Sequence, residues 1–148
     1  QGLGYGAQDL LDRFLQILGI NLPWNVAVVG VVRLGRAILS YPGFNPDGFH
    51  LVAAFDLNGS VVGEDVGGLK VRNMDELDKV VAKEKISIAI VAVPVEFTQN
   101  VVDQLVACGV QAILNYAPIT PQVREGIRIR NIDPVLSLQS MTYYINDD

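Results

Sequence analysis

The first shortages in this 148-residue chain are of cysteine and histidine, since it has one of each. Cys108 has no second cysteine with which to form an internal disulfide, so a reducing cytoplasm is the expected compartment. His50 cannot build a metal site by itself, and a cysteine–histidine pair for nucleophilic catalysis is not expected either. The composition therefore predicts a cytoplasmic protein without structural zinc.

Long apolar runs and an excess of basic residues are also lacking. The longest apolar run, residues 86–95, contains Ser87 and Pro94 and is far shorter than the ~18 residues of a membrane span. No basic segment followed by an apolar one marks a secretion signal. Eleven Lys and Arg against sixteen Asp and Glu give a net charge of −5, whereas nucleic-acid-binding domains normally carry a basic face. We expect no membrane segment and no direct DNA binding by these residues.

Apolar runs that alternate with amphipathic segments are what the chain does have, and half of its residues are hydrophobic. This alternation predicts a single α/β domain, a Rossmann-like, doubly wound, mostly parallel sheet covered by helices. Strands are expected at 25–29, 50–55, 86–93, 111–114 and 126–130, with a short edge strand at 70–72. Helices are expected at 7–18, from the turn at 30–35 to about 41, at 73–83, along an apolar stripe over 97–106, and from 134 to about 144.

Residues typical of helix ends accompany two of the expected helices. Asn73 is expected to cap the helix at 73–83, with Glu76 completing a capping box. Asp133 is expected to cap the last helix, with Pro134 at its first position. That last helix is apolar nearly all round and must be buried, which predicts packing on a second copy of the chain. We divide the chain into a linker helix at 1–22, a Rossmann domain at 23–132 and a C-terminal dimerisation helix at 133–148.

The main site signal is the turn after the first strand, in the run Val26-Ala-Val-Val-Gly30-Val-Val-Arg-Leu-Gly35-Arg. Asp56 closes the next strand, at the distance where Rossmann folds place an acid. In that arrangement a pyrophosphate lies on the helix N-terminus and the acid takes the adenosine ribose hydroxyls. Because an acid repels a 2′-phosphate, NAD(H) is expected in preference to NADP(H).

The glycine fingerprint departs from its usual form at one position. G-x-G-x-x-G requires glycine at position 32, and this chain has Val32. The middle glycine lets the backbone approach the pyrophosphate, so a β-branched side chain must turn away, shift the loop or clash. We expect weaker binding or a displaced pyrophosphate. Arg33 is expected near phosphate, and a solvated surface charge is the plainer alternative.

Two later segments follow strands and should reach the same edge of the sheet. They contain Val93 and Pro94, and Asn115 and Tyr116. A nucleotide-lining role is favoured by their shared position, although Pro and Asn also occur in ordinary turns. Proton donors are scarce, with only Tyr41, Tyr116 and Cys108 as loose candidates, so no catalytic residue is predicted.

These segments taken in order resemble the Rex family of redox-sensing transcriptional repressors. The resemblance covers essentially the whole chain and is carried by Asn25-Val-Ala-Val-Val-Gly with Leu34-Gly-Arg-Ala, Ser40-Tyr-Pro-Gly-Phe, Val52-Ala-Ala-Phe-Asp, Val66-Gly-Gly-Leu, Ile90-Val-Ala-Val-Pro, Ile113-Leu-Asn-Tyr-Ala-Pro, and Arg130-Asn-Ile-Asp with the Tyr-Tyr helix. It implies a cytoplasmic homodimer with a swapped C-terminal helix. It also implies a Rossmann domain that senses the NADH/NAD⁺ ratio, NADH being preferred, without catalysis.

The resemblance implies roles for single residues and for a domain that is not in this sequence. Gly30, Arg33, Leu34 and Gly35 would hold the pyrophosphate, and Asp56 the adenosine ribose. Tyr41 would sit by the nicotinamide and pair with Asp133 of the other subunit. Operator DNA would be bound only through an N-terminal winged-helix domain, which these residues lack, and NADH would release it by changing the dimer geometry. The first residue is Gln rather than Met, which is typical of a fragment or a processed chain.

Two other classes of function remain open from the residues. One is an enzyme or ligase module, either a small NAD-dependent oxidoreductase or a CoA-binding ligase-type Rossmann domain. The other is a dimerisation module that has lost its ligand, because a fold does not by itself imply a function.

Overall fold

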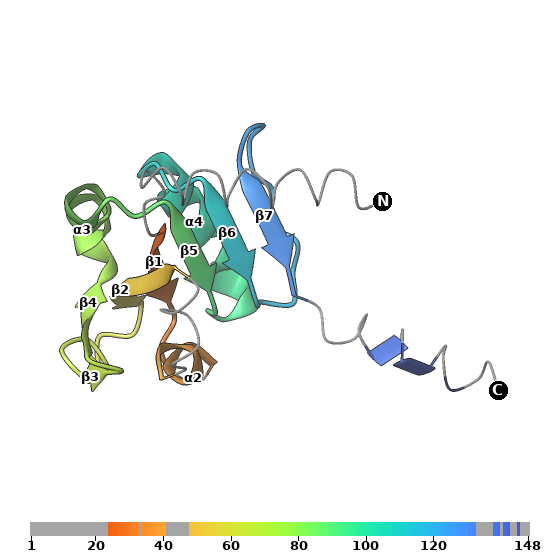
Figure 1. Ribbon diagram of the computed structural model, residues 1–148, viewed down its shortest axis with the longest axis horizontal. Coiled ribbons are helices and arrows are strands. Elements are labelled where there is room, and N and C mark those ends of the chain that lie inside the picture. Colours follow the sequence, from red (N-terminus) through yellow and green to blue (C-terminus); the bar gives the residue numbers. More distant parts are fainter. Residues whose placement is uncertain are drawn as a thin grey trace.

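A computed structural model describes residues 24–32, 34–40, 48–132, 138–139, 141–142 and 145 of the chain. The described strands form one seven-stranded sheet in the order β3-β4-β2-β1-β5-β6-β7 (Figure 1). Its elements are β1 (Trp24–Val29), α2 (Leu34–Leu39), β2 (Phe49–Asp56), β3 (Asp65–Val66), β4 (Leu69–Asn73), α3 (Leu77–Glu84), β5 (Ile88–Val91), α4 (Val95–Ala107), β6 (Ala112–Asn115) and β7 (Arg128–Asn131). The predicted helix at 7–18 and most of the last helix lie outside the described residues, so the proposed division into three segments stays a prediction.

The order of the strands is that of a doubly wound fold, as predicted. β1 lies in the middle and pairs in parallel with β2 on one side and with β5 on the other. The chain therefore builds β2 and β4 outward from β1, returns to place β5 on its other side, and continues to β6 and β7. The strand order reverses between β1 and β5, which is where open α/β sheets bind their ligands.

Two hydrophobic cores lie on opposite faces of the sheet. α3 and α4 cover one face, where Phe55, Val81 and Leu105 are buried together. The six residues of α2 cover the other face, where Ile38 and Leu39 pack with side chains from β1, β2 and β4. β1 is Val-rich and buried because helices cover it on both sides. Among the described residues, no helix is long and apolar enough to span a bilayer.

The predicted edge strand at 70–72 is wrong in its position. β4 is an inner strand that pairs in parallel with β2, and the edge is β3, which pairs with β4 in the antiparallel direction. β3 has two residues and lies between Gly63 and Gly67, both of which have positive φ angles. So short a strand between glycines has no periodicity by which the sequence could reveal it.

The capping box predicted after β4 forms only in part. Asn73 accepts a hydrogen bond of 2.9 Å at Oδ1 from the backbone N–H of Asp75, as expected of a cap. Glu76 does not return to Asn73, because its carboxylate accepts from Arg72 at 2.9 Å. The first turn is a 3₁₀ helix, and the α-helix begins only at Leu77.

Candidate functional site

A cleft of about 870 Å³ lies at the carboxyl ends of β1, β2, β5 and β6, over the point where the strand order reverses. Concave sites at this position are where doubly wound folds hold their ligands. The cleft is lined by residues that follow these four strands, namely Gly30, Val32, Leu34, Asp56, Leu57, Asn58, Ala92, Val93, Pro94, Phe97, Tyr116, Ala117 and Pro118.

Most of the predicted site residues meet in this cleft. Those that line it are Gly30, Val32, Leu34, Asp56, Val93, Pro94 and Tyr116. Gly35 and Asn115 are buried beside it and are not among its lining residues. Arg33, Tyr41 and Asp133 lie outside the described residues, so their predicted roles stay predictions.

The turn after β1 is closed by two glycines that no larger residue could replace. Gly30 has a φ of +98°, and a Cβ atom there would lie 2.4 Å from the carbonyl oxygen of Ala92. A Cβ atom on Gly35 would lie 1.6 Å from the carbonyl oxygen of Gly30. The backbone N–H of Gly30 donates to the Phe55 carbonyl at 2.8 Å. The first and third glycines of the fingerprint are therefore required by backbone contact between β1, α2 and the end of β5.

Asp56 ties the end of β2 to this turn. The residue is 6% exposed, and its Oδ2 atom accepts a hydrogen bond of 2.8 Å from the backbone N–H of Val31. Its Oδ1 atom accepts from the N–H of Asn58, also at 2.8 Å. A carboxylate has about four acceptor positions, so both oxygens can still accept hydrogen bonds from ligand hydroxyls. Asp56 thus shapes the turn and presents a fixed acceptor at the wall of the cleft.

The side chain of Val32 stands at the wall of the cleft. The residue is 51% exposed and lines the cleft, whereas its neighbour Val31 is completely buried. The methyl groups of Val32 therefore cover a part of the turn where a glycine would expose the backbone. A ligand that follows the turn meets an apolar side chain before it meets the N–H groups behind it.

Asn115 organises the loop that carries Tyr116. Its side chain is fully buried, and its Nδ2 atom donates to the Ile119 carbonyl at 2.8 Å and to Asn131 Oδ1 at 2.9 Å. Its Oδ1 atom accepts from the backbone N–H of Ala117 at 3.0 Å. The amide is occupied within the protein, so its contribution to the cleft is to place Tyr116 and Ala117.

Phe97 corrects the predicted apolar stripe of α4. We expected it to be buried with Val101 and Leu105, but Phe97 is 45% exposed and lines the cleft. The first turn of α4 extends past the end of β5, so residues there have no sheet beneath them, and Val95 is likewise 41% exposed. The sequence does indicate this exposure, because Phe97 follows Pro94 by three residues and so falls in the first turn of the helix. Leu57 and Asn58, which follow Asp56 directly, were missed as well.

The groups available for acid–base or metal chemistry are few. Among the residues that the structure describes, no three His, Cys, Asp or Glu side chains come together as a metal site. Of the described residues that line the cleft, Asp56 and Tyr116 are ionisable. Cys108, a loose candidate for a proton donor, lies just beyond the end of α4, which is about 20 Å long and begins at the cleft.

The Cys108 thiol has a local partner instead of a place in the site. Its Sγ atom donates to Asp78 Oδ1 at 2.7 Å. Burial, and then the hydrogen bond and negative charge of Asp78, raise its pKa to about 12. A thiol that keeps its proton at neutral pH is a poor nucleophile, so Cys108 is not a catalytic candidate.

Comparison with known proteins agrees with this geometry. Residues 21–119 match the family described as CoA binding domain. The redox-sensing transcriptional repressor Rex of Roseiflexus sp. (strain RS-1) is 45% identical over 148 residues, which are 100% of this chain and 67% of that protein. The curated relatives are named as repressors and not as enzymes, as the scarcity of proton donors predicted.

Two solved structures match the fold over most of the chain. A crystal structure of RSP in complex with beta-NADH matches with a TM-score of 0.81 and 30% identity, covering 95% of this chain and 68% of that one. The structure of RSP in complex with beta-NAD⁺ and operator DNA matches with the same TM-score and identity, covering 95% of this chain and 64% of that one.

Proposed function

Because the chain carries the CoA binding domain fold and belongs to the Rex family of redox-sensing transcriptional repressors, we propose that its cleft binds NAD(H) and reports the redox state of that cofactor without transforming it. The observation that carries the proposal is the turn at 30–35. Two glycines close it by backbone contact and Asp56 holds it by a buried hydrogen bond, at the position where Rossmann folds bind a dinucleotide.

The placement of the cofactor within the cleft is part of the proposal. Gly30, Val32, Arg33, Leu34 and Gly35 would border the pyrophosphate. Asp56 would accept hydrogen bonds from the adenosine ribose hydroxyls, and its negative charge would disfavour the 2′-phosphate of NADP(H). Val93 and Pro94 would line the remainder together with Tyr116, whose loop Asn115 helps to place.

A preference for the reduced cofactor follows from the character of the wall beside β5 and β6. The reduced nicotinamide ring is neutral and the oxidised ring is cationic. The nearby lining includes Val93, Pro94 and Ala117, whose aliphatic side chains do not compensate a positive charge. NADH is therefore the form we expect to bind more tightly, with Tyr41 beside the ring and paired with Asp133 of a second subunit.

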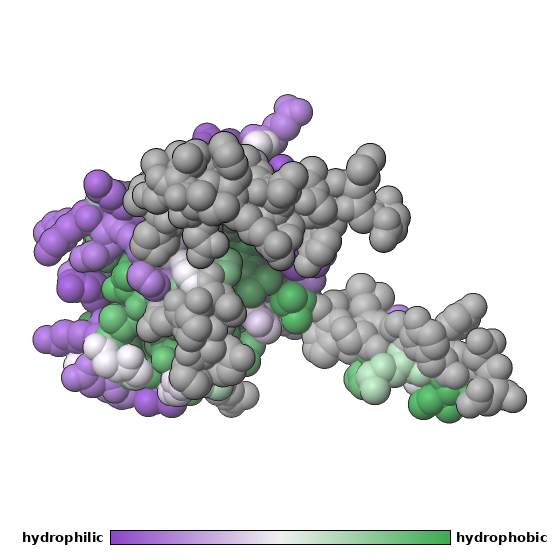
Figure 2. Space-filling model, in the orientation of Figure 1, coloured by the Kyte–Doolittle hydropathy of each residue, from purple (hydrophilic) through white to green (hydrophobic). Residues whose placement is uncertain are grey.

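Dimerisation through the C-terminal segment is a further part of the proposal. Leu138, Met141 and Ile145 are 59%, 59% and 69% exposed and recur at helical spacing. Figure 2 shows hydrophobic surface on the described residues of this segment. Exposed apolar side chains of this kind favour a partner surface, and we assign it to a second copy that exchanges the same segment.

Transcriptional control would follow from a differential affinity. If NADH binds one dimer geometry better than the other, the NADH/NAD⁺ ratio shifts the population between the two. Operator DNA would be contacted in the cytoplasm by a winged-helix domain outside these residues, because the net charge of −5 does not favour contact through this domain.

Titration with nucleotides tests the proposal directly. The fluorescence of Trp24, which is the single tryptophan, and of NADH can be followed as NADH, NAD⁺, NADPH and CoA are added in parallel. We expect NADH to bind most tightly, then NAD⁺, with NADPH and CoA weaker than both. Absence of binding by NADH and NAD⁺ would overturn the proposal, and tighter binding of CoA would favour the ligase-type alternative. Loss of NADH upon incubation with carbonyl compounds would favour the oxidoreductase.

A further inference from the structure

The turn that follows Asp56 carries the sequence Asn58-Gly59-Ser60 at the rim of the cleft. All three residues are exposed, and Asn58 lines the cleft. The backbone N–H of Val61 donates to the Asn58 carbonyl at 3.2 Å, which closes a turn with asparagine at its first position, where turns favour it. No other asparagine of the sequence is followed directly by glycine. The pair brings a side-chain amide next to the least hindered of backbone nitrogens.

We propose that Asn58 is a site of spontaneous deamidation. The backbone nitrogen of Gly59 gives its proton to hydroxide and attacks Cγ of Asn58. The new N–Cγ bond closes a succinimide ring, the Cγ–Nδ2 bond breaks, and the amide nitrogen takes a proton from water and leaves as ammonia. Water then opens the ring at either carbonyl, which gives aspartate or its β-linked isomer, isoaspartate. The net reaction consumes one water and releases one ammonia.

The attacking nitrogen of Gly59 is accessible. Its N–H donates none of the backbone hydrogen bonds found between the described residues. A Cβ atom at this position would meet nothing within 4 Å, so no neighbouring group restrains the residue. Because glycine has the widest range of backbone conformations, the nitrogen can turn toward Cγ at little cost.

The carbon that is attacked is made more electrophilic by Ser60. The Oδ1 atom of Asn58 accepts hydrogen bonds from the Ser60 backbone N–H at 3.0 Å and from Ser60 Oγ at 2.8 Å. Donors aimed at a carbonyl oxygen stabilise the negative charge that develops there when a nucleophile adds to the carbon. Both hydrogen bonds therefore favour the addition of the Gly59 nitrogen.

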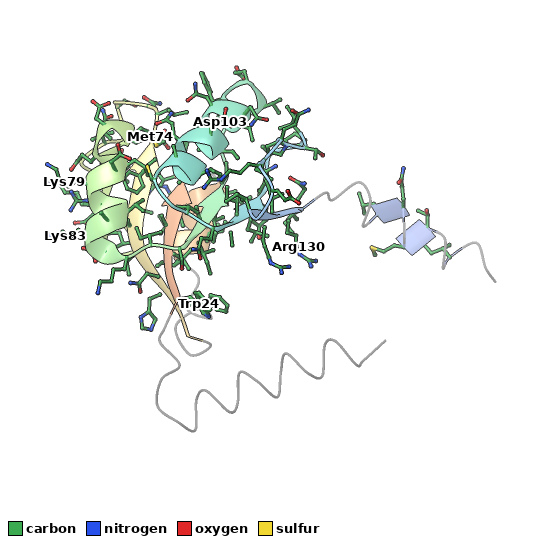
Figure 3. All side chains as sticks on the ribbon, turned by 90° about the horizontal axis from the view of Figure 1, so that it is seen from above. Trp24, Met74, Lys79, Lys83, Asp103 and Arg130 are labelled. Atoms are coloured by element: carbon green, nitrogen blue, oxygen red, sulfur yellow. The ribbon has the colours of Figure 1, made fainter. Side chains whose placement is uncertain are left out.

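Asn73 is a matched comparison within the same chain. It is also exposed, and its Oδ1 atom also accepts from the backbone N–H two residues on, that of Asp75, at 2.9 Å. The residue after it is Met74, whose buried side chain begins the 3₁₀ turn that leads into α3 (Figure 3). Packing and helical geometry hold the backbone nitrogen of Met74 in place, so we expect Asn73 to keep its amide.

Deamidation changes the cleft at the place that the proposed function assigns to adenosine. The backbone N–H of Asn58 donates to Asp56 Oδ1 at 2.8 Å, so the new carboxylate forms close to the one already present. The cleft loses the N–H donors of an amide and gains a negative charge, which repels the pyrophosphate of a dinucleotide. This consequence rests on the proposed binding of NAD(H), whereas the reaction itself does not.

The reaction is tested by incubating the chain without nucleotide at mildly alkaline pH and mapping its tryptic peptides by mass spectrometry. We expect residue 58 to show the mass change of NH₂ replaced by OH, and part of the product to be methylated by an isoaspartate methyltransferase. Gly59→Ala should slow the change by about tenfold or more, because a Cβ atom restricts the backbone at the attacking nitrogen. A rate at Asn58 no higher than that at Asn73, or an unchanged rate in Gly59→Ala, would overturn the inference.

The consequence for the cleft is measured by NADH titration of the fresh chain, the incubated chain and an incubated Gly59→Ala chain. We expect the deamidated fraction, and Asn58→Asp as its mimic, to bind NADH more weakly by on the order of tenfold. The incubated Gly59→Ala chain should keep the affinity it had when fresh. Equal affinity of fresh and deamidated chains would refute the effect on the cleft. Failure of the fresh chain to bind NADH would contradict the proposed function instead, while the mass change at Asn58 would still support the reaction.

Discussion

The Oδ2 atom of Asp56 accepts a hydrogen bond of 2.8 Å from the backbone N–H of Val31, although 25 residues separate them. The bond joins the end of β2 to the turn that follows β1, and both ends of it are buried. The residue that would recognise the adenosine ribose is therefore also the residue that fixes the turn beside the pyrophosphate.

This double role predicts that Asp56→Ala lowers stability as well as affinity. The substitution leaves the buried N–H of Val31 without its acceptor, which costs about 1–3 kcal/mol. We expect the free energy of unfolding in urea to fall by about this amount and NADH affinity to fall by tenfold or more, on the order of 1.4 kcal/mol. Asp65→Ala, which removes an exposed carboxylate from β3, is the control and should change neither. A loss of affinity at unchanged stability would show that the bond to Val31 contributes little.

The contact between Gly35 and Gly30 predicts a steep steric cost. A Cβ atom on Gly35 would lie 1.6 Å from the Gly30 carbonyl oxygen, so Gly35→Ala must push α2 away from β1. We expect a loss of about 2 kcal/mol or more in the free energy of unfolding, measured by urea denaturation. Gly59→Ala is the matched control, because a Cβ atom there meets nothing within 4 Å. Equal stability of the two variants would contradict the packing of α2 on the turn.

We predict that replacing Val32 by glycine increases the affinity for NADH. The Val32 side chain is half exposed at the cleft wall, where glycine would open the backbone to the ligand. Val32→Gly should tighten NADH binding by about tenfold, or ~1.4 kcal/mol, in the fluorescence titration. Val95→Ala shortens another exposed valine that does not line the cleft, and should leave NADH affinity unchanged. Weaker binding by Val32→Gly would mean that the valine methyls contact the cofactor favourably.

From the raised pKa of the Cys108 thiol we predict that the free energy of unfolding depends on pH in the alkaline range. That pKa is raised from 9.0 to about 12 by burial and by Asp78. Between these values the unfolded chain loses the thiol proton while the folded chain keeps it. The unfolded state then binds fewer protons than the folded state. This group therefore makes the free energy of unfolding fall as pH rises from about 9 to about 12. Below that window its contribution does not change with pH.

The same shift is measurable by alkylation. Reaction of Cys108 with iodoacetamide should be slow at a pH of about 8 and faster in Asp78→Asn, because the thiolate becomes easier to form without the neighbouring carboxylate. Asp103→Asn changes another exposed carboxylate, on α4 itself, and should not alter the rate. A rate in Asp78→Asn equal to that of the unchanged chain would leave burial as the sole cause.

Much of the fold could be predicted because its signals are local. Val-rich β1 and the buried part of β2 are continuous apolar strands of a parallel sheet, and the glycines at 30 and 35 mark the turn between β1 and α2. Asp56 was found from its distance along the chain to that turn. These features depend on residue type and spacing, which the sequence displays directly.

The parts that sequence could not supply depend on contacts between distant segments. The inner position of β4 follows from its pairing with β2, and Glu76 leaves its cap because Arg72 competes for it. Phe97 has the spacing of a core residue, but the first turn of α4 extends beyond the sheet. Asn115 has the type and place of a ligand-binding residue, yet its amide is engaged by Ile119 and Asn131.

The sequence alone determined the class of fold, the position of the glycine turn and the choice of an acid at residue 56, since apolar periodicity and glycine spacing act over short stretches of chain. The tertiary structure decided that Asp56 anchors the turn and that Val32 faces the cleft. Those outcomes depend on which strands become neighbours, and burial and hydrogen bonding between neighbouring strands are set only once the sheet has formed.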